Sequence, residues 1–118
     1  MSTRDLGNLG EELAIELLKK NGYKILQRNF QCKLGEIDII ALDKNTLVFV
    51  EVKTRWSKEF GLPEESITPW KIRKISQVSQ YYKLLHPDLP DLLRIDAVCI
   101  DISDQENKKM KIIRNLTG

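Results

Sequence analysis

The chain has 118 residues, of which 42% are hydrophobic and 31% are charged, and its formal net charge at pH 7 is +2. This length predicts a single domain over residues 1–118, and because no apolar run approaches the roughly 20 residues that a membrane span needs, a transmembrane protein is excluded. The two cysteines are too few and too far apart in sequence to indicate a disulfide framework or a zinc site. The N-terminal stretch turns acidic before the apolar segment of a secretory signal develops, so we expect the protein in the cytoplasm.

The first predicted element is an amphipathic helix, which begins with Ser2 or Thr3 as N-cap and ends at Asn21-Gly22. Its leucines recur at helical spacing, at Leu6, Leu9, Leu13 and Leu17. The polar face consists of Asn8, Glu12, Glu16 and Lys19. Glu11 falls instead on a semi-apolar stripe, so it is expected to face protein and to need a partner, such as a metal-centred group. The alternative is an ordinary first-turn acid, favoured by the helix dipole.

Three strands are predicted next, over residues 23–30, 34–42 and 47–53, with the last two joined by a turn over 43–46. Three strands in series indicate an antiparallel meander. Charged residues interrupt the apolar sequence of the last two strands, at Glu36, Asp38, Glu51 and Lys53. A small protein rarely places such residues in its most strand-like stretch without a function for them.

These charges fall on one surface of the predicted hairpin. Side chains alternate across a strand, so a four-residue turn sets Asp38 opposite Glu51 and Glu36 opposite Lys53, with apolar pairs nearer to the turn. The other surface is expected to carry Ile37, Ile39, Val48, Val50 and Val52. Two carboxylates whose β-carbons are about 5 Å apart repel each other by roughly 3 kcal/mol at an effective dielectric near 20.

That repulsion needs compensation, and three kinds are open. One carboxylate could hold a proton, Lys53 could neutralise part of the charge, or a divalent cation could bind between the acids. Mg²⁺ suits two acids beside an open cleft, because it usually takes only one or two protein carboxylates and keeps several waters. The alternative is a structural ion pair of Glu36 with Lys53, which leaves Asp38 and Glu51 exposed to solvent.

A second helix is predicted between Thr68-Pro69, a cap followed by a proline at the first helical position, and His86-Pro87. Its apolar stripe consists of Ile72, Ile75, Val78, Tyr82 and Leu85. A strand covered on both faces follows over 92–102, and a final edge strand over 110–116. The order α-β-β-β-α-β, in which a strand follows a helical crossover, predicts an α/β fold with one mixed sheet flanked by helices.

The segment 53–83 carries a local excess of positive charge, with seven basic residues against three acidic ones. Such a surplus can favour a polyanion. A side stripe of the second helix could grip a phosphate backbone or stack a base, and it consists of Trp70, Lys74, Gln77 and Tyr81, with Lys71 near the apolar face. The alternative is a solvated face whose aromatic residues serve helix packing.

The acidic hairpin resembles the PD-(D/E)xK nuclease superfamily, because Asp38 is followed, after twelve intervening residues, by Glu51-Val52-Lys53. The preceding helix with Glu11 is similar to that of the Holliday junction resolvase-like branch. More narrowly, the chain resembles the YraN-type family of small bacterial proteins. That likeness rests on motifs in a fixed order: G-x-x-G-E-x-x-A at 7–14, G-Y-x-I-L-x-R-N at 22–29, G-E-I-D at 35–38, V-F-V-E-V-K-x-R at 48–55 and R-I-D at 94–96.

The resemblance implies a restriction-endonuclease-like fold and a Mg²⁺- or Mn²⁺-dependent endonuclease that hydrolyses phosphodiester bonds in DNA, branched or structured DNA included. Asp38 and Glu51 would hold the metal ion, and Glu11 would complete or support its shell. Lys53 would orient a water or stabilise charge on the phosphorus centre. Contacts with nucleic acid would come from Arg55, Lys71, Arg73, Lys74, Gln77 and Tyr81. A homodimer could span a junction. The alternative is a non-catalytic nucleic-acid-binding module that retains the nuclease scaffold.

Overall fold

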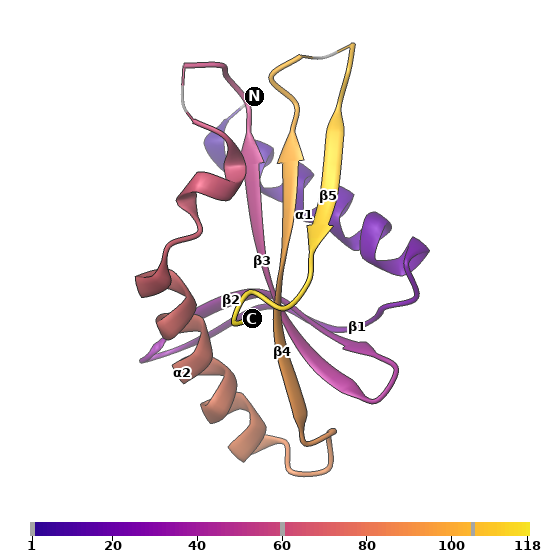
Figure 1. Ribbon diagram of the computed structural model, residues 1–118, viewed down its shortest axis with the longest axis vertical. Helices are drawn as coiled ribbons and strands as arrows, with labels where there is room; N and C mark the ends of the chain where they lie inside the picture. Colours follow the sequence, from indigo (N-terminus) through magenta and orange to yellow (C-terminus); the bar gives the residue numbers. More distant parts are fainter. Residues whose placement is uncertain (1, 60, 105) are drawn as a thin grey trace.

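The computed structural model describes residues 2–59, 61–104 and 106–118 and shows an α/β fold in which one mixed sheet has a helix on each face (Figure 1). The elements in chain order are α1 (Thr3–Lys20), β1 (Lys24–Cys32), β2 (Gly35–Asp43), β3 (Thr46–Arg55), the short 3-10 helix η1 (Pro63–Ser66), α2 (Pro69–Leu85), β4 (Leu92–Asp101) and β5 (Lys109–Ile113). The predicted fold class is confirmed, and the arrangement is consistent with a restriction-endonuclease-like fold. In the described part of the chain, no helix has the length and apolarity of a membrane span.

A capping box begins α1. The Ser2 hydroxyl accepts a hydrogen bond from the Asp5 backbone N–H at 3.1 Å, and the Asp5 carboxylate accepts one from the Ser2 N–H at 3.3 Å. The helix ends at Lys20 with Asn21 as its C-cap, and Gly22 follows with φ 88°, a left-handed conformation that glycine adopts without strain. Both predicted ends are confirmed, with Ser2 as the N-cap.

The sheet has the strand order β1-β2-β3-β4-β5, and β3 and β4 are its parallel pair. The other neighbouring strands are antiparallel. Parallel neighbours require a long crossover, and α2 provides it. The β2–β3 hairpin turns through Lys44 and Asn45, and Leu42 lies opposite Leu47. The predicted register near this turn is therefore confirmed.

Each face of the sheet carries one apolar cluster. The cluster against α1 consists of Ala14, Ile15, Leu18, Tyr23, Ile39, Ala41, Val48, Val50, Val98 and Ile100. The cluster against α2 consists of Ile37, Ile40, Leu47, Phe49, Ile75, Val78, Tyr82 and Ile95. Because β3 and β4 contribute to both clusters, their sequences are almost continuously apolar.

Two predicted core positions are wrong. Ile37 does not share a face with Ile39, because it packs in the cluster against α2. The alternation is interrupted beside Asn29 of β1, whose φ of 53° is not that of a strand, although the register of β1 with β2 is unbroken from Arg28 to Cys32. Leu85 is 51% exposed and lines a pocket instead of a core cluster.

Gly10 allows α1 to approach β3 closely. A Cβ atom at Gly10 would collide with the Thr54 side chain, whereas a Cβ atom at Gly7, one turn earlier, would meet no atom within 4 Å. We expect Gly10→Ala to lower the free energy of unfolding by about 1–2 kcal/mol, because the cost of overpacking exceeds the gain in helix propensity. Gly7→Ala is the control and should raise it by about 0.5–1 kcal/mol. Urea unfolding measures both changes, and equal stabilisation by the two would contradict the close approach.

Candidate active site

The strands β2 and β3 are paired from the turn as far as Ile39 and Val50. Asp38 comes next on β2, and its Oδ2 atom accepts a hydrogen bond from the Val52 backbone N–H at 2.8 Å. At this position the Asp38 carboxylate, instead of a backbone carbonyl of β2, is the acceptor for a backbone N–H of β3. The prediction that Asp38 and Glu51 form a directly opposed cross-strand pair is therefore wrong, although Asp38 remains within the electrostatic influence of Glu51.

Several carboxylates surround Asp38. Burial, followed by the charge of Glu51, raises the pKa of Asp38 to about 7. Glu11 and Glu36 act in the same direction, and the hydrogen bond from Val52 opposes them. Near neutral pH the Asp38 carboxyl is therefore stabilised either by a proton or by a nearby cation. Both were among the compensations predicted from the sequence.

Glu51 is buried, with 6% of its surface exposed, and two lysines neutralise it. Its Oε1 atom lies 3.3 Å from the Nζ atom of Lys53 and 3.5 Å from the Nζ atom of Lys71. Lys71 belongs to the first turn of α2, so the crossover helix brings a second ammonium group to this acid. The predicted alternative in which Lys53 pairs with Glu36 is wrong, because Lys53 pairs with Glu51 and Glu36 accepts a hydrogen bond from Gln31 at 3.4 Å.

Glu11 reaches the same region from α1. Its Oε1 atom is buried and has no hydrogen-bond partner among the described residues. Burial raises the pKa of Glu11, and the guanidinium group of Arg28 opposes this rise. Glu11, Asp38 and Lys53 line one pocket of about 270 Å³. The prediction that Glu11 faces protein is confirmed, and the alternative of a first-turn acid is wrong because α1 begins at Thr3.

The residues of this pocket fit a divalent cation without forming a complete cage. Within residues 2–59, 61–104 and 106–118, no three His, Cys, Asp or Glu side chains are arranged to hold a metal ion by themselves. Mg²⁺ does not need such a cage, because one or two carboxylates and several waters suffice. Asp38 lines the pocket and is a carboxylate of this kind. Glu51 does not line the pocket, but its charge raises the pKa of Asp38. The unpartnered Oε1 atom of Glu11 could accept a hydrogen bond from a hydrating water.

Asp38→Asn should stabilise the metal-free protein at neutral pH. The raised pKa means that the folded protein holds this proton more tightly than the unfolded chain does, so the free energy of unfolding falls as pH rises from about 4 to about 7 and stays low above that. Asparagine carries no charge and still offers an oxygen to the Val52 N–H. We expect a gain of about 2 kcal/mol at pH 8, roughly half of what the full pKa shift would give, because the side chain keeps some contact with solvent.

Urea unfolding in EDTA at pH 5 and pH 8 measures this gain, which should be smaller at pH 5. Glu16→Gln, on the exposed face of α1, is the control and should show no such gain. An Asp38→Asn protein that is no more stable than the parent chain at pH 8 would contradict the predicted destabilising charge.

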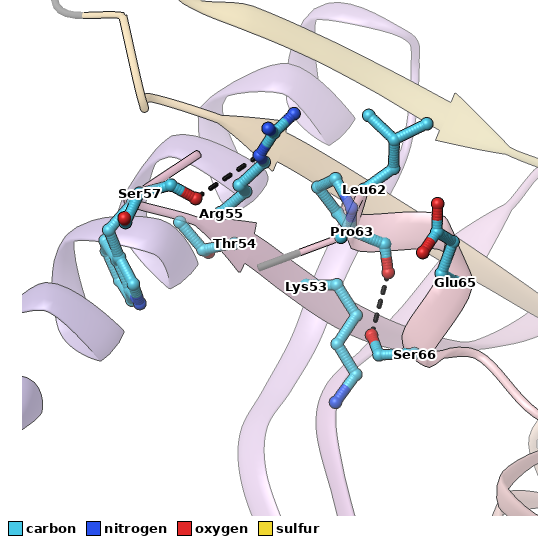
Figure 2. A pocket seen from close by; sticks show the side chains of 10 residues that line it. Lys53, Thr54, Arg55, Ser57, Leu62, Pro63, Glu65 and Ser66 are labelled. Atoms are coloured by element: carbon cyan, nitrogen blue, oxygen red, sulfur yellow. Dashed lines mark hydrogen bonds between the residues drawn. The ribbon is translucent and has the colours of Figure 1, made fainter. Parts of the chain in front are cut away.

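A larger pocket of about 460 Å³ adjoins the first, and Lys53 lines both. Its lining comes from the end of β3 and from η1, including Ser66 (Figure 2). Arg55 also lines it, with Nη1 3.2 Å from the Asp101 carboxylate and Nε donating to the Ser57 carbonyl oxygen at 3.4 Å. Arg55 is therefore a cation held in place at the pocket rim.

The other candidate contacts for nucleic acid lie on α2, outside these pockets. The Nζ atom of Lys74 lies 5.7 Å from the ring centroid of Trp70, within the range of a cation–π contact. Arg73 and Gln77 are exposed, and Tyr81 is 39% exposed. These residues extend a basic and aromatic surface along the helix.

Two features of the site were absent from the sequence analysis. Val52 supplies the backbone N–H that holds Asp38, and Trp56 lines both pockets. Neither has a sequence signal, because every residue except proline carries an N–H and a single tryptophan is equally compatible with core packing. The R-I-D motif corresponds to an ion pair between Arg94 and the buried Asp96 at 2.9 Å, a contact that the motif alone does not predict.

The family model that matches this chain and the similar proteins described next carry the same family name. The family model described as "Uncharacterised protein family UPF0102" matches residues 10–100, which include the four acidic and basic residues of the candidate site. A UPF0102 protein of Caldicellulosiruptor saccharolyticus is 61% identical over 98 residues, 83% of each chain. One of Clostridium botulinum (strain Hall) is 45% identical over 116 residues, 95% of this chain and 93% of the relative. One of Caldicellulosiruptor bescii is 45% identical over 117 residues, 98% of each. The chain therefore belongs to the uncharacterised protein family UPF0102.

Proposed function

We propose that this protein is a metal-dependent endonuclease that hydrolyses phosphodiester bonds in DNA, branched or structured DNA included. The observation that carries the proposal is the crowding of acidic side chains around Asp38 at a pocket that Lys53 also lines. Mutually repelling carboxylates in partly buried positions oppose folding, and such arrangements cluster at functional sites. The resemblance to the PD-(D/E)xK nuclease superfamily supports the same conclusion.

Each residue of the site has a role in this proposal. Asp38 and Glu51 would hold Mg²⁺ or Mn²⁺, and Glu11 would complete or support the shell. A bound ion of this kind lowers the pKa of a water and polarises a phosphoryl oxygen. Lys53 would orient the attacking water or donate to a phosphate oxygen as negative charge develops. Lys71 also contacts Glu51, so it can keep Glu51 neutralised when Lys53 turns toward a phosphate.

DNA is the proposed partner because Lys53 and Arg55 line the two adjoining pockets and further basic residues lie along α2. Contacts with phosphate supply most of the affinity of such proteins and position the strand. The residues proposed for these contacts are Arg55, Lys71, Arg73, Lys74, Gln77 and Tyr81. A homodimer would present two such pockets to the arms of a branched substrate.

The test is incubation of the purified protein with Mg²⁺ or Mn²⁺ and labelled linear, flapped and four-way DNA. We expect cleavage of at least one substrate that EDTA abolishes and that Asp38→Asn and Glu51→Gln proteins lack. The proposal fails if no substrate is cut with either metal, or if cutting persists in both variants.

A second candidate is a non-catalytic nucleic-acid-binding module. It is favoured by the absence, within the described residues, of three side chains arranged to chelate a metal unaided. This candidate predicts DNA binding that weakens steeply with salt and no metal-dependent cutting. Binding that is indifferent to ionic strength would count against it.

A further inference from the structure

A groove runs along α2 on the side where the tip of the β1–β2 hairpin lies. Two neighbouring pockets, of about 310 and 410 Å³, share Cys32, Lys33 and Leu34 of this tip. The opposite side of the first pocket is formed by the start of α2, and that of the second by its last turns. Together the two pockets follow the helix for most of its length.

The hairpin tip rests on the middle of α2. Gly35 has φ 143°, and a Cβ atom there would lie 3.3 Å from a methyl carbon of Val78. Glycine therefore lets the turn approach the helix closely, and the chain on either side of this contact leaves space against the helix surface. The groove is a consequence of how the hairpin bends, and it is separate from the pocket that Glu11 and Asp38 line.

Two aromatic side chains line the groove with much of their surface uncovered. Trp70 is 60% exposed in the first pocket, and Tyr81 is 39% exposed in the second. Neither belongs to the core clusters, so packing does not explain them. Tyr81 is eleven positions after Trp70, about 16 Å along the helix axis, which is about the length of five nucleotides at 3.4 Å per nucleotide of one strand.

The charge of the groove is positive. Lys33, Lys71 and Lys74 line it, against the single acid Glu36. Lys74 contacts the indole ring of Trp70, so one nucleotide could stack on the ring and bring its phosphate to an ammonium group. The groove also leads to the candidate active site, because Lys71 pairs with Glu51 at 3.5 Å.

We propose that this groove binds single-stranded nucleic acid, with unpaired bases stacked on Trp70 and Tyr81 and phosphates held by Lys33, Lys71 and Lys74. The inference rests on the proposed function, since it names unpaired nucleotides beside the cleavage site as the substrate class. A duplex hides the faces of its bases, so exposed aromatic rings select an unpaired strand. The three lysines favour a polyanion over an apolar protein partner.

The test measures binding without catalysis. Fluorescence anisotropy in EDTA compares a labelled twelve-nucleotide oligothymidylate with a twelve-base-pair duplex, for the full chain and for its variants. We expect Trp70→Ala and Tyr81→Ala each to weaken oligothymidylate binding about tenfold and duplex binding less than about twofold. Lys74→Gln should reduce the slope of log affinity against log salt by about 0.7. Leu84→Ala is the matched control, because Leu84 is 78% exposed on α2 and lines neither pocket.

The proposal is overturned if both aromatic variants bind the oligothymidylate like the parent chain, or if they lose duplex affinity equally. It is also overturned if sedimentation shows that the parent chain is a dimer which Trp70→Ala separates while oligothymidylate binding is unchanged, since the groove would then hold a second copy. Failure of the endonuclease proposal looks different. In that case the groove variants lose oligothymidylate binding as expected, and no DNA is cut in Mg²⁺ or Mn²⁺.

Discussion

Asp38→Asn is expected to slow DNA cleavage by at least about a thousandfold while it raises the stability of the metal-free protein. The carboxylate is crowded by Glu51, Glu11 and Glu36, so its charge opposes folding, and in the proposed mechanism that charge holds the metal ion. Removing the charge relieves the repulsion and also removes the proposed metal ligand. Single-turnover cleavage of the best substrate in saturating Mg²⁺ measures the rate, and urea unfolding in EDTA measures the stability.

The opposite signs of the two changes make this variant informative. A loss of activity in a more stable protein cannot come from unfolding.

Lys53→Met should slow cleavage by about a hundredfold to a thousandfold, because it removes one donor near the pocket. Lys58→Met, an exposed lysine in the next loop, is its control and should stay within about twofold. Cleavage by the Asp38→Asn protein at the rate of the parent chain would exclude Asp38 as a metal ligand.

Asp96→Ala is expected to lower the free energy of unfolding by about 3–5 kcal/mol. Asp96 is fully buried and accepts hydrogen bonds from the Tyr23 hydroxyl at 2.7 Å, from Arg94 Nε at 2.9 Å and from the Asn115 backbone N–H at 2.9 Å. Its removal leaves these donors without this acceptor, while Arg94 keeps its ion pair with Asp43 and its hydrogen bond to the Tyr23 hydroxyl oxygen. Urea unfolding at neutral pH measures the loss.

Asp91→Ala is the matched control for this buried network. Asp91 also pairs with a cation, Lys83 at 3.2 Å, but its side chain is 97% exposed. Its loss should therefore change stability by less than about 1 kcal/mol. If Asp96→Ala prevents folding altogether, Asp96→Asn keeps an acceptor oxygen and should show a smaller loss of about 1–3 kcal/mol. Equal effects of the buried and exposed variants would contradict the network.

The apolar pattern of the two hairpin strands predicted the register correctly near the turn and failed at Asp38. Leu42 and Leu47 are held together by a turn of two residues, so local geometry decides their pairing. The strand pairing ends at Ile39 and Val50, and beyond it the Asp38 carboxylate accepts a hydrogen bond from the Val52 N–H. The alternation of apolar and polar residues along a strand does not show where a side chain, instead of the backbone, accepts a hydrogen bond from the neighbouring strand.

The acidic residues of the candidate site were identified from sequence, and Lys53 was predicted as one group that could neutralise them, but Lys71 was not. Glu36 was considered as the partner of Lys53 because the two are neighbours in an ideal hairpin. In the folded protein Lys53 and Lys71 share Glu51 instead. Lys71 is twenty residues from Glu51 in the chain, and only the return of the crossover helix over the sheet brings them together.

The sequence by itself determined the order of the elements, the ends of α1 and the chemical character of the site. Caps, turns and the periodicity of apolar residues act over a few neighbouring positions, so they can be recognised without a fold. Only the tertiary structure decided that Glu11 reaches Asp38, that Lys71 neutralises Glu51 and that the hairpin tip forms a groove with α2. These contacts join distant parts of the chain, and their geometry depends on how strongly the strands bend and how closely the helices approach the sheet.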